Sequence, residues 1–310
     1  MEDENPTGPA APPGESPVRL EPELARADVE SGETGVVAPE AGAPPEAGAP
    51  AMFSSVFVEP PARAIWRGRD LVIFVVLAFA WLIVSEFVCL SGYAILKPIL
   101  GWQTTTEDIL QNAIFAVVAQ AIYYGPLLLY IFVLVSVQYR LPFWEGIHWR
   151  WPGGRQALKI FLSGVVLAVG LLVVHLWLPE GGSFPLQKLF SSPAAAYVIA
   201  VFSVTVAPFM EEIIFRGVLF AFFERLAGVR FALVASALLF AGIHVPEYWG
   251  AWSGLVLILV VGLVCSSARA LTKSVVPGVI VHVAYNGTLM CLLFLGSQHF
   301  RNLPGLFTLR

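Results

Sequence analysis

The stretch Pro208-Phe-Met-Glu-Glu-Ile-Ile-Phe-Arg-Gly-Val218 places two acids and an arginine inside the apolar run Ala194–Phe223. A helix of about 20 apolar residues crosses the roughly 30 Å hydrocarbon core of a bilayer, so this run is long enough to span a membrane. A charged side chain inside the bilayer costs at least about 2.5–3.5 kcal/mol on insertion scales, which makes such side chains functional candidates. The stretch therefore predicts a membrane helix that carries a polar site.

The whole chain has the composition of a membrane protein. Of its 310 residues, 57% are hydrophobic and 13% are charged, and the mean hydropathy is +0.75. These values exclude a soluble globular protein. We predict an all-α, polytopic transmembrane helical bundle of about seven spans, with a range of six to eight, because Pro208 can kink the fourth apolar run and the fifth is short. The candidate spans are Leu71–Tyr93, Gln111–Val137, Ala157–Leu178, Ala194–Phe223, Phe231–His244, Gly250–Ala268 and Val275–Gly296.

The N-terminal part has a different character. Its first 60 residues hold twelve acids and two bases, a net charge of −10, whereas the remainder carries +6. Residues 1–61 consist mostly of Pro, Ala, Gly and Glu, so we expect a disordered acidic tail that buries too little apolar surface to fold. It lacks the basic start and early apolar run of a secretory signal, and the first span is expected to remain as an anchor. The predicted parts are the tail (1–61), the N-terminal transmembrane helices with an interfacial segment (62–190), the transmembrane core with the polar site (191–298) and a short C-terminal tail (299–310).

Lysine and arginine gather beside alternate spans. They precede the first span, separate the second from the third, and follow the fourth and the sixth. By the positive-inside rule this pattern predicts a multi-pass protein with a cytoplasmic N-terminus. The Trp-rich and Arg-containing segment Leu141–Trp151 is typical of the headgroup region, where His148 is expected to be an interfacial polar residue. Because the basic residues are scattered, the expected partner is the lipid bilayer and not a nucleic acid.

Helical spacing assigns the charged residues of the opening stretch to different tasks. Glu212 and Arg216 are four residues apart and share one helix face, whereas Glu211 lies about 140° from Arg216. We therefore expect Glu212 to pair with Arg216 and Glu211 to be free for another task. Polar pairs also hold transmembrane helices together, so a purely structural role stays open for Glu212 and Arg216.

Two further apolar runs carry pairs of residues at the same four-residue spacing, one polar pair and one of an aromatic residue with a histidine. His282 and Asn286 are four residues apart, as are Phe240 and His244. Polar side chains on separate membrane helices can satisfy one another only by converging. A desolvated Glu can act as a general base with an adjacent His, and Asn and His side chains can donate to a developing oxyanion. The residues predict water-mediated hydrolysis of an acyl bond within the membrane.

Glu86 and His175 also lie in apolar runs, but neither has a partner at helical spacing. We expect them to contact neighbouring helices or to face water.

At these positions the sequence resembles the CPBP family of intramembrane glutamate endopeptidases, which includes the type II CAAX prenyl endopeptidases and the abortive-infection and lysostaphin-resistance-A-like proteins. The family carries three motifs in order, and the resemblance covers about residues 195–290. Glu-Glu-x-x-x-Arg is matched by Glu211, Glu212 and Arg216, Phe-x-x-x-His by Phe240 and His244, and His-x-x-x-Asn by His282 and Asn286.

The resemblance implies a helical bundle with a cavity open toward the membrane and the cytosol. It implies that Glu211 activates water with help from His244, and that His282 and Asn286 form the oxyanion hole. Glu212, Arg216 and Phe240 would support this geometry. We expect no metal or other cofactor. Zinc held by Glu211, His244 and His282 is the alternative, weakened because no HExxH motif is present and Asn286 is a poor zinc ligand.

The expected function is therefore an intramembrane endopeptidase of the plasma membrane of a bacterium. It would cleave near the C-terminus of a membrane-associated protein or peptide, including a prenylated CAAX-type protein. One alternative is a non-catalytic membrane scaffold or bacteriocin-immunity-like protein of the same fold. A transporter that relays protons through Glu86, Glu211 and the histidines is weaker, because the chain shows no inverted repeat.

Overall fold

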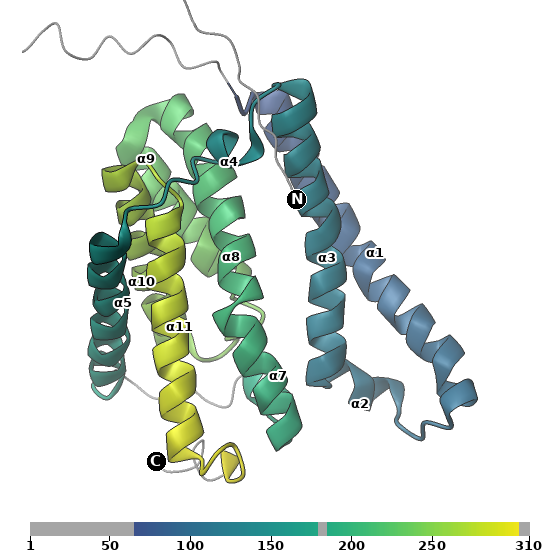
Figure 1. Cartoon of the computed structure of the whole chain (residues 1–310). Helices are drawn as coiled ribbons and strands as arrows, with labels where there is room; N and C mark the ends of the chain where they lie inside the picture. Colours follow the sequence, from purple (N-terminus) through teal and green to yellow (C-terminus); the bar gives the residue numbers. More distant parts are fainter. Residues whose placement is uncertain (1–64, 179–184, 304–310) are drawn as a thin grey trace, which may run out of the picture. The chain divides into compact units, whose positions relative to one another are not determined.

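The computed structural model describes residues 65–178 and 185–303, and every regular element in these two ranges is a helix (Figure 1). The all-α prediction is confirmed. The predicted tail over 1–61 and most of the predicted C-terminal tail, 304–310, lie outside the described residues.

The helices include long membrane-spanning elements and short connecting ones. Within residues 65–178 and 185–303, six continuous helical stretches are long and apolar enough to cross a bilayer, which agrees with the predicted range and makes the chain a multi-pass integral membrane protein. The elements are α1 (Gly68–Leu100), α2 (Thr106–Leu110), α3 (Ala113–Val133), η1 (Leu134–Gln138), α4 (Phe143–Gly146), α5 (Gly154–His175), α6 (Pro185–Leu189), α7 (Pro193–Val204), α8 (Val206–Glu212), η2 (Ile213–Leu219), α9 (Phe220–Ile243), α10 (Trp252–Thr272) and α11 (Val276–Gly296); η1 and η2 are π-helical.

One of the six stretches, Pro193–Ile243, is 51 residues long. At 1.5 Å per residue it would extend for about 75 Å, far more than one bilayer crossing. Non-helical backbone angles at Ala227 and Gly228 break it. The rings of Phe215 and Phe240 lie 5.3 Å apart, although about 25 residues of straight helix would separate them by about 37 Å. The chain therefore doubles back at this break, between the fourth and fifth predicted apolar runs.

A second irregularity lies within the first half of this stretch. Between α7 and α8 the backbone of Thr205 departs from helical geometry, with φ −114° and ψ −74°. Pro208 follows in the first turn of α8, where its missing N–H cannot bond to the carbonyl of Val204. The kink expected from Pro208 thus falls one turn before the proline and just ahead of the two acids.

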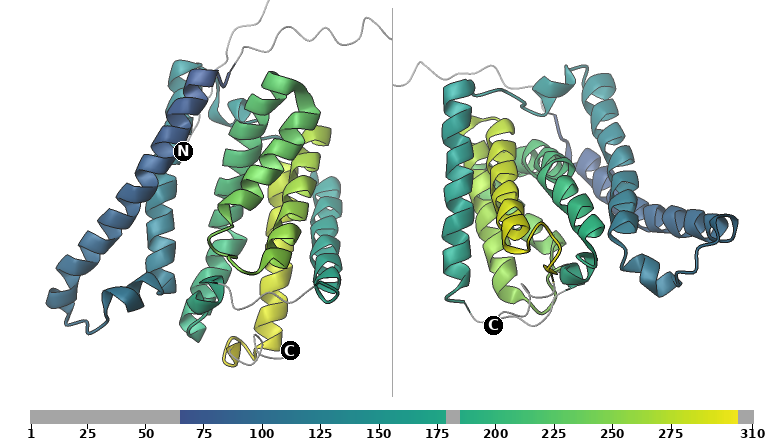
Figure 2. Two further views of the ribbon diagram at one scale, coloured as in Figure 1. Left: turned by 180° about the vertical axis from the view of Figure 1, so that it is seen from behind. Right: turned by 60° about the horizontal axis from the view of Figure 1, so that its bottom comes forward.

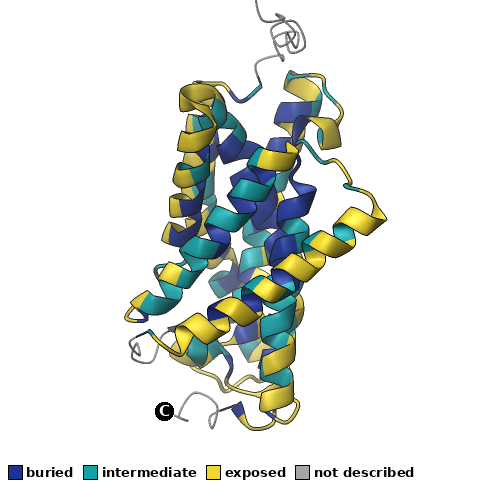
Figure 3. Cartoon of the chain, turned by 90° about the vertical axis from the view of Figure 1, so that its left-hand side faces the viewer, coloured by how far each residue is buried: buried dark blue, intermediate teal, exposed yellow. Residues whose placement is uncertain are grey.

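The long helices pack in pairs, α1 with α3, α5 with α11 and α9 with α10, and Figure 2 shows these pairs from two sides. Gly164 of α5 permits the closest approach, because a β-carbon there would lie 2.7 Å from the carbonyl oxygen of Val281 in α11. Buried residues gather between the helices, and many apolar side chains on their outward surfaces are exposed (Figure 3). Exposed apolar helix surface is expected where the surroundings are lipid.

The connecting segments define two ends of the bundle. At the end that we call the basic end, the carbonyl of Ile65 accepts a hydrogen bond from Arg225 at 2.6 Å, and the N–H of Val275 donates to the carbonyl of His148 at 3.0 Å. At the opposite end, the N–H of Leu186 donates to the carbonyl of Glu247 at 3.2 Å. An apolar cluster with Ala113, Phe190, Ala195, Phe300 and Leu303 also lies at this opposite end.

Candidate active site

The Glu-Glu-x-x-x-Arg stretch lies where α8 passes into η2. Glu211, Glu212 and Arg216 are all buried. Oε1 of Glu212 lies 2.8 Å from Nη1 of Arg216, and neither side chain has any exposed surface. The other guanidinium nitrogen, Nη2, donates to the carbonyl of Gly262 in α10 at 2.8 Å. The pair expected from helical spacing is therefore present, and it also joins η2 to α10.

His282 of α11 lies between the two carboxylates. Its Nδ1 is 3.1 Å from Oε1 of Glu212, and its Nε2 is 3.7 Å from Oε2 of Glu211. The first distance is a hydrogen bond, whereas the second is too long for one. Glu212 thus bonds Arg216 and His282 with the same oxygen, and it couples two motifs that are far apart in the sequence. Helical spacing pointed His282 toward Asn286 and gave no sign of this contact.

His244 closes the C-terminal end of α9. Its Nδ1 lies 2.8 Å from the carbonyl oxygen of Phe240. A carbonyl only accepts, so Nδ1 carries the hydrogen and Nε2 is left with a lone pair. The ring of Phe240 lies 4.9 Å from the ring of His244 and 5.6 Å from that of His282. Phe240 therefore contacts both imidazoles, and the guanidinium carbon of Arg216 lies 4.7 Å from the centre of its ring.

Asn286 is half-buried on α11 one turn beyond His282. Its side-chain nitrogen donates to the carbonyl of Ser203 in α7 at 2.7 Å. This bond uses one of the two amide hydrogens and leaves the second for another acceptor. It also fixes the amide between α7 and α11.

One cavity joins these residues. It has a volume of about 230 Å³, and Glu211, His244, His282 and Asn286 all line it. Glu212 and Arg216 are not among its lining residues, so they lie behind the cavity wall and can act only through others. The structure thus brings together the four side chains for which the sequence predicted a catalytic role; of the predicted supporting residues, Glu212 and Arg216 lie behind them and Phe240 lines the cavity.

The cavity has further polar lining residues that the sequence analysis did not single out. They include Gln120 of α3, Tyr285 of α11, and Glu247 and Tyr248 in the turn after His244. The side chain of Glu247 keeps an exposed surface, yet burial of its carboxyl by the surrounding protein raises its pKa, and the nearby His244 opposes this shift. Glu247 could have been found in the sequence, because it is an acid three residues after the motif histidine. Gln120 lies in an ordinary apolar run and gave no such signal.

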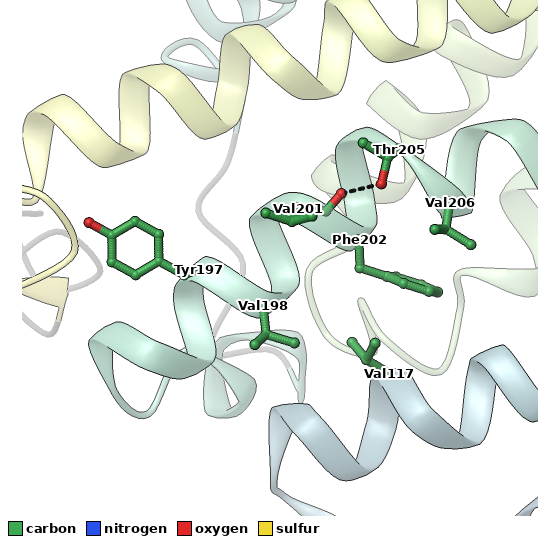
Figure 4. Close-up of a pocket in the computed structure, with 7 residues that line it drawn as sticks. All are labelled: Val117, Tyr197, Val198, Val201, Phe202, Thr205 and Val206. Atoms are coloured by element: carbon green, nitrogen blue, oxygen red, sulfur yellow. Dashed lines mark hydrogen bonds between the residues drawn. The ribbon is translucent and has the colours of Figure 1, made fainter.

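An apolar groove lies beside the cavity (Figure 4). Its volume is about 390 Å³, and Val117 and Phe202 line both the groove and the cavity. The hydroxyl of Thr205 donates to the carbonyl of Val201 at 2.6 Å, so the polar group of this lining residue is already satisfied. The groove therefore offers apolar contact next to the polar cavity. Its lining residues are Val117, Tyr197, Val198, Val201, Phe202, Thr205 and Val206.

Glu211, His244 and His282 are residue types that can bind zinc. In the described ranges no three His, Cys, Asp or Glu side chains lie where they could hold one ion. His282 directs one nitrogen to each carboxylate, and the Nδ1 of His244 is bonded to a backbone carbonyl. Zinc held by Glu211, His244 and His282 stays the alternative, and the mechanism proposed below uses no metal.

Comparison with known proteins identifies the part of the chain that carries these residues. Residues 193–288 match the family model described as type II CAAX prenyl endopeptidase Rce1-like. Searches of curated proteins and of solved structures found no match. The matched segment begins at α7 and extends beyond Asn286, so all three motifs lie within it. Residues 193–288 are therefore similar to the Rce1-like type II CAAX prenyl endopeptidases, and this match agrees with the CPBP family that the motifs resemble.

Proposed function

We propose that this protein is an intramembrane endopeptidase that hydrolyses a peptide bond of a membrane-associated protein or peptide. The observation that carries the proposal is the single cavity lined by Glu211, His244, His282 and Asn286. These side chains supply a base, two imidazoles and an amide donor, which are the groups that water-mediated hydrolysis of an amide requires.

In the proposed reaction Glu211 removes a proton from a water molecule, and the water oxygen forms a bond to the carbonyl carbon of the substrate. His244 assists by accepting a hydrogen bond from the water at Nε2, because its Nδ1 is held by the carbonyl of Phe240. The C–N bond then breaks, and the proton held by Glu211 passes to the leaving amine. Water enters as the only co-reactant, and the products are a carboxylic acid and an amine.

The developing oxyanion needs hydrogen-bond donors on the opposite side of the substrate. Asn286 has one amide hydrogen free of Ser203. Nε2 of His282 donates as well when both ring nitrogens carry hydrogen, because Nδ1 donates to the carboxylate of Glu212 and Nε2 lies 3.7 Å from Glu211, which is too long for a hydrogen bond. Glu212 bonds Nδ1 of His282 and therefore sets the direction of the ring, while Arg216 holds Glu212 in place. We propose that Glu212, Arg216 and Phe240 position the reacting groups.

The apolar groove supports a substrate that is attached to the membrane. It adjoins the cavity at Val117 and Phe202, so a lipid chain or an apolar helix could lie in it while the peptide enters the cavity. Cleavage near the C-terminus of the substrate, with a prenylated CAAX-type protein as one case, belongs to this proposal.

The test uses the purified full-length protein in detergent micelles and a library of hydrophobic peptides, with and without a prenylated cysteine. Products are identified by mass spectrometry for wild type, Glu211→Ala and His244→Ala. We expect cleavage by wild type and loss of cleavage in both variants. Full cleavage by either variant would overturn the mechanism, and loss of wild-type cleavage on adding a chelator would support the zinc alternative.

The competing function is a non-catalytic membrane scaffold or immunity-like protein, in which the polar residues only hold helices together. The bonds from Arg216 to Glu212 and to Gly262 would serve that role equally well. It predicts no cleavage of any library peptide and a biological effect that survives Glu211→Gln. Detection of a wild-type product that Glu211→Gln does not form would exclude it.

A further inference from the structure

The cavity extends along only part of the length of the helices that line it. In α11 its first lining residue is His282, and the others lie toward the C-terminal end of that helix. In α8 the last lining residue is Glu211, and in α3 it is Gln120. These residues lie inside their spans and not at the ends, so the cavity reaches from the interior of the bundle toward one end.

That end is the one opposite the basic end. Leu186 and Phe190 of the α6 segment line the cavity, as do Ala113 at the start of α3 and Tyr248 in the turn after α9. The hydrogen bond between Leu186 and Glu247 and the shared apolar cluster place these segments together at the opposite end. The part of the cavity that reaches this end is therefore lined by the segments that close this end of the bundle.

Toward the basic end, tightly packed apolar side chains close the path. Phe240 lies at the cavity wall, and beyond it the buried cluster continues with Phe215, Leu219 and Trp66. Trp66 is 2% exposed and Leu219 is 8% exposed. None of these three residues lines the cavity. A peptide could not pass through this layer without unpacking it.

The charges of the connecting segments predict which side of the membrane each end of the bundle faces. In the described ranges the basic end carries Arg67, Arg69, Arg140, Arg150, Arg155 and Lys273, among others, and the opposite end carries Lys97, Lys188 and Arg301. Cytoplasmic loops of membrane proteins are the ones enriched in Lys and Arg. The basic end is therefore expected in the cytoplasm.

We propose that the cavity receives its substrate from the non-cytoplasmic face of the membrane. The inference rests on the proposed function and narrows its substrate class to membrane-attached peptide segments that are exposed on that face. It differs from the cytosolic opening that the family resemblance implies, and it disfavours a protein held by a lipid on the cytoplasmic leaflet.

The experiment uses sealed vesicles of both orientations that contain the full chain. The probe is a quenched fluorescent peptide that the protein cleaves in detergent, linked to a palmitoyl chain and to a sulfonated dye that cannot cross the bilayer. We expect cleavage in right-side-out vesicles and little in inverted ones, with a difference of at least about tenfold that disappears when detergent opens the vesicles. Cleavage confined to inverted vesicles, or equal in both, would overturn the inference. Absence of any cleavage in detergent would instead overturn the proposed function.

The orientation is measured independently with a membrane-impermeant maleimide. Cys291 is replaced by Ala because it is exposed, whereas Cys89 and Cys265 are buried. Single cysteines are then introduced by Glu107→Cys at the opposite end and Arg155→Cys at the basic end, since both positions are exposed. We expect labelling of Glu107→Cys, and not of Arg155→Cys, in right-side-out vesicles. The reverse pattern would place the opposite end in the cytoplasm and overturn the inference.

Discussion

Glu86 in α1 and Glu212 in α8 are the same residue type in apolar membrane helices, yet their surroundings differ. Glu86 is exposed on a helix with few buried side chains. Glu212 is fully buried and bonds both Arg216 and His282. An exposed acid can turn toward the interface at modest cost, whereas a buried one needs fixed partners. The difference shows that membrane depth alone does not identify a site, and that fixed partners do.

The sharpest test of the comparison is exchange of a carboxylate for an amide at Glu211 and at Glu86. Glu211→Gln removes the proposed base at almost unchanged volume, so we expect kcat to fall by about 10²–10⁴-fold. Glu86→Gln is the matched control, an acid in an apolar span that does not line the cavity, and should stay within about twofold of wild type. Both are measured with the same cleaved peptide. A comparable loss in the two variants would remove the distinction between the helices.

A second test disrupts the buried ion pair of Glu212 and Arg216. Arg216→Met leaves the carboxylate of Glu212 buried without its cation, and we expect a loss of about 3–5 kcal/mol in the free energy of unfolding. The double variant Glu212→Gln with Arg216→Met should recover part of this loss, because no unpaired charge remains. Arg155→Met, at an exposed position, should change stability little. The free energies come from denaturant unfolding in detergent, and a double variant less stable than Arg216→Met would contradict the expectation.

A third test concerns the close packing of α5 against α11 at Gly164. Gly164→Ala would put a β-carbon 2.7 Å from both the carbonyl oxygen of Val281 and the β-carbon of Ala284. Since neither neighbour is a flexible side chain, we expect destabilisation of about 1–3 kcal/mol. Gly170→Ala in the same helix meets nothing within 4 Å and should be neutral or slightly stabilising. Equal melting temperatures for the two variants would show that α5 and α11 do not pack this closely.

The smallest expected effect involves His148, which lies between α4 and α5, outside the spans. Burial, aided by the charges of Arg269 and Arg150, lowers its pKa from 6.5 to about 4. As the pH falls, the unfolded chain therefore binds a proton before the folded protein does. The stabilising contribution is full above about pH 6.5 and is lost as the pH falls to about 4. Because His148 is only half-buried, solvent screening reduces it to on the order of 1 kcal/mol.

The measurement is the melting temperature across this pH window. We expect His148→Gln to show a shallower decrease than wild type, because the group that links stability to protons is gone. His175→Gln, at an exposed position near the end of α5, serves as the control and should keep the wild-type slope. Identical slopes for all three proteins would show that His148 does not titrate in this way.

Much of the fold follows from local patterns along the chain. The apolar runs are long enough to predict spans, and the four-residue spacing is enough to predict the pair of Glu212 with Arg216. The same four-residue spacing did not predict the hydrogen-bond partners of His282. Its nearest polar partners are Glu212 at 3.1 Å and Glu211 at 3.7 Å, both on another helix. Asn286 likewise bonds Ser203 of α7, which no motif marked.

The sequence by itself determined that the chain is an α-helical membrane protein, and it predicted that a few polar residues at helical spacing carry its chemistry. Hydropathy and the 3.6-residue helical period act within one segment, so they are readable without knowing its neighbours. Only the tertiary structure decided that the chain doubles back at Ala227 and Gly228, that His282 lies between two carboxylates, and that the cavity is lined by segments of the end opposite the basic end. These features depend on how different helices pack against one another, and side-chain packing between distant segments leaves no periodic trace in the sequence.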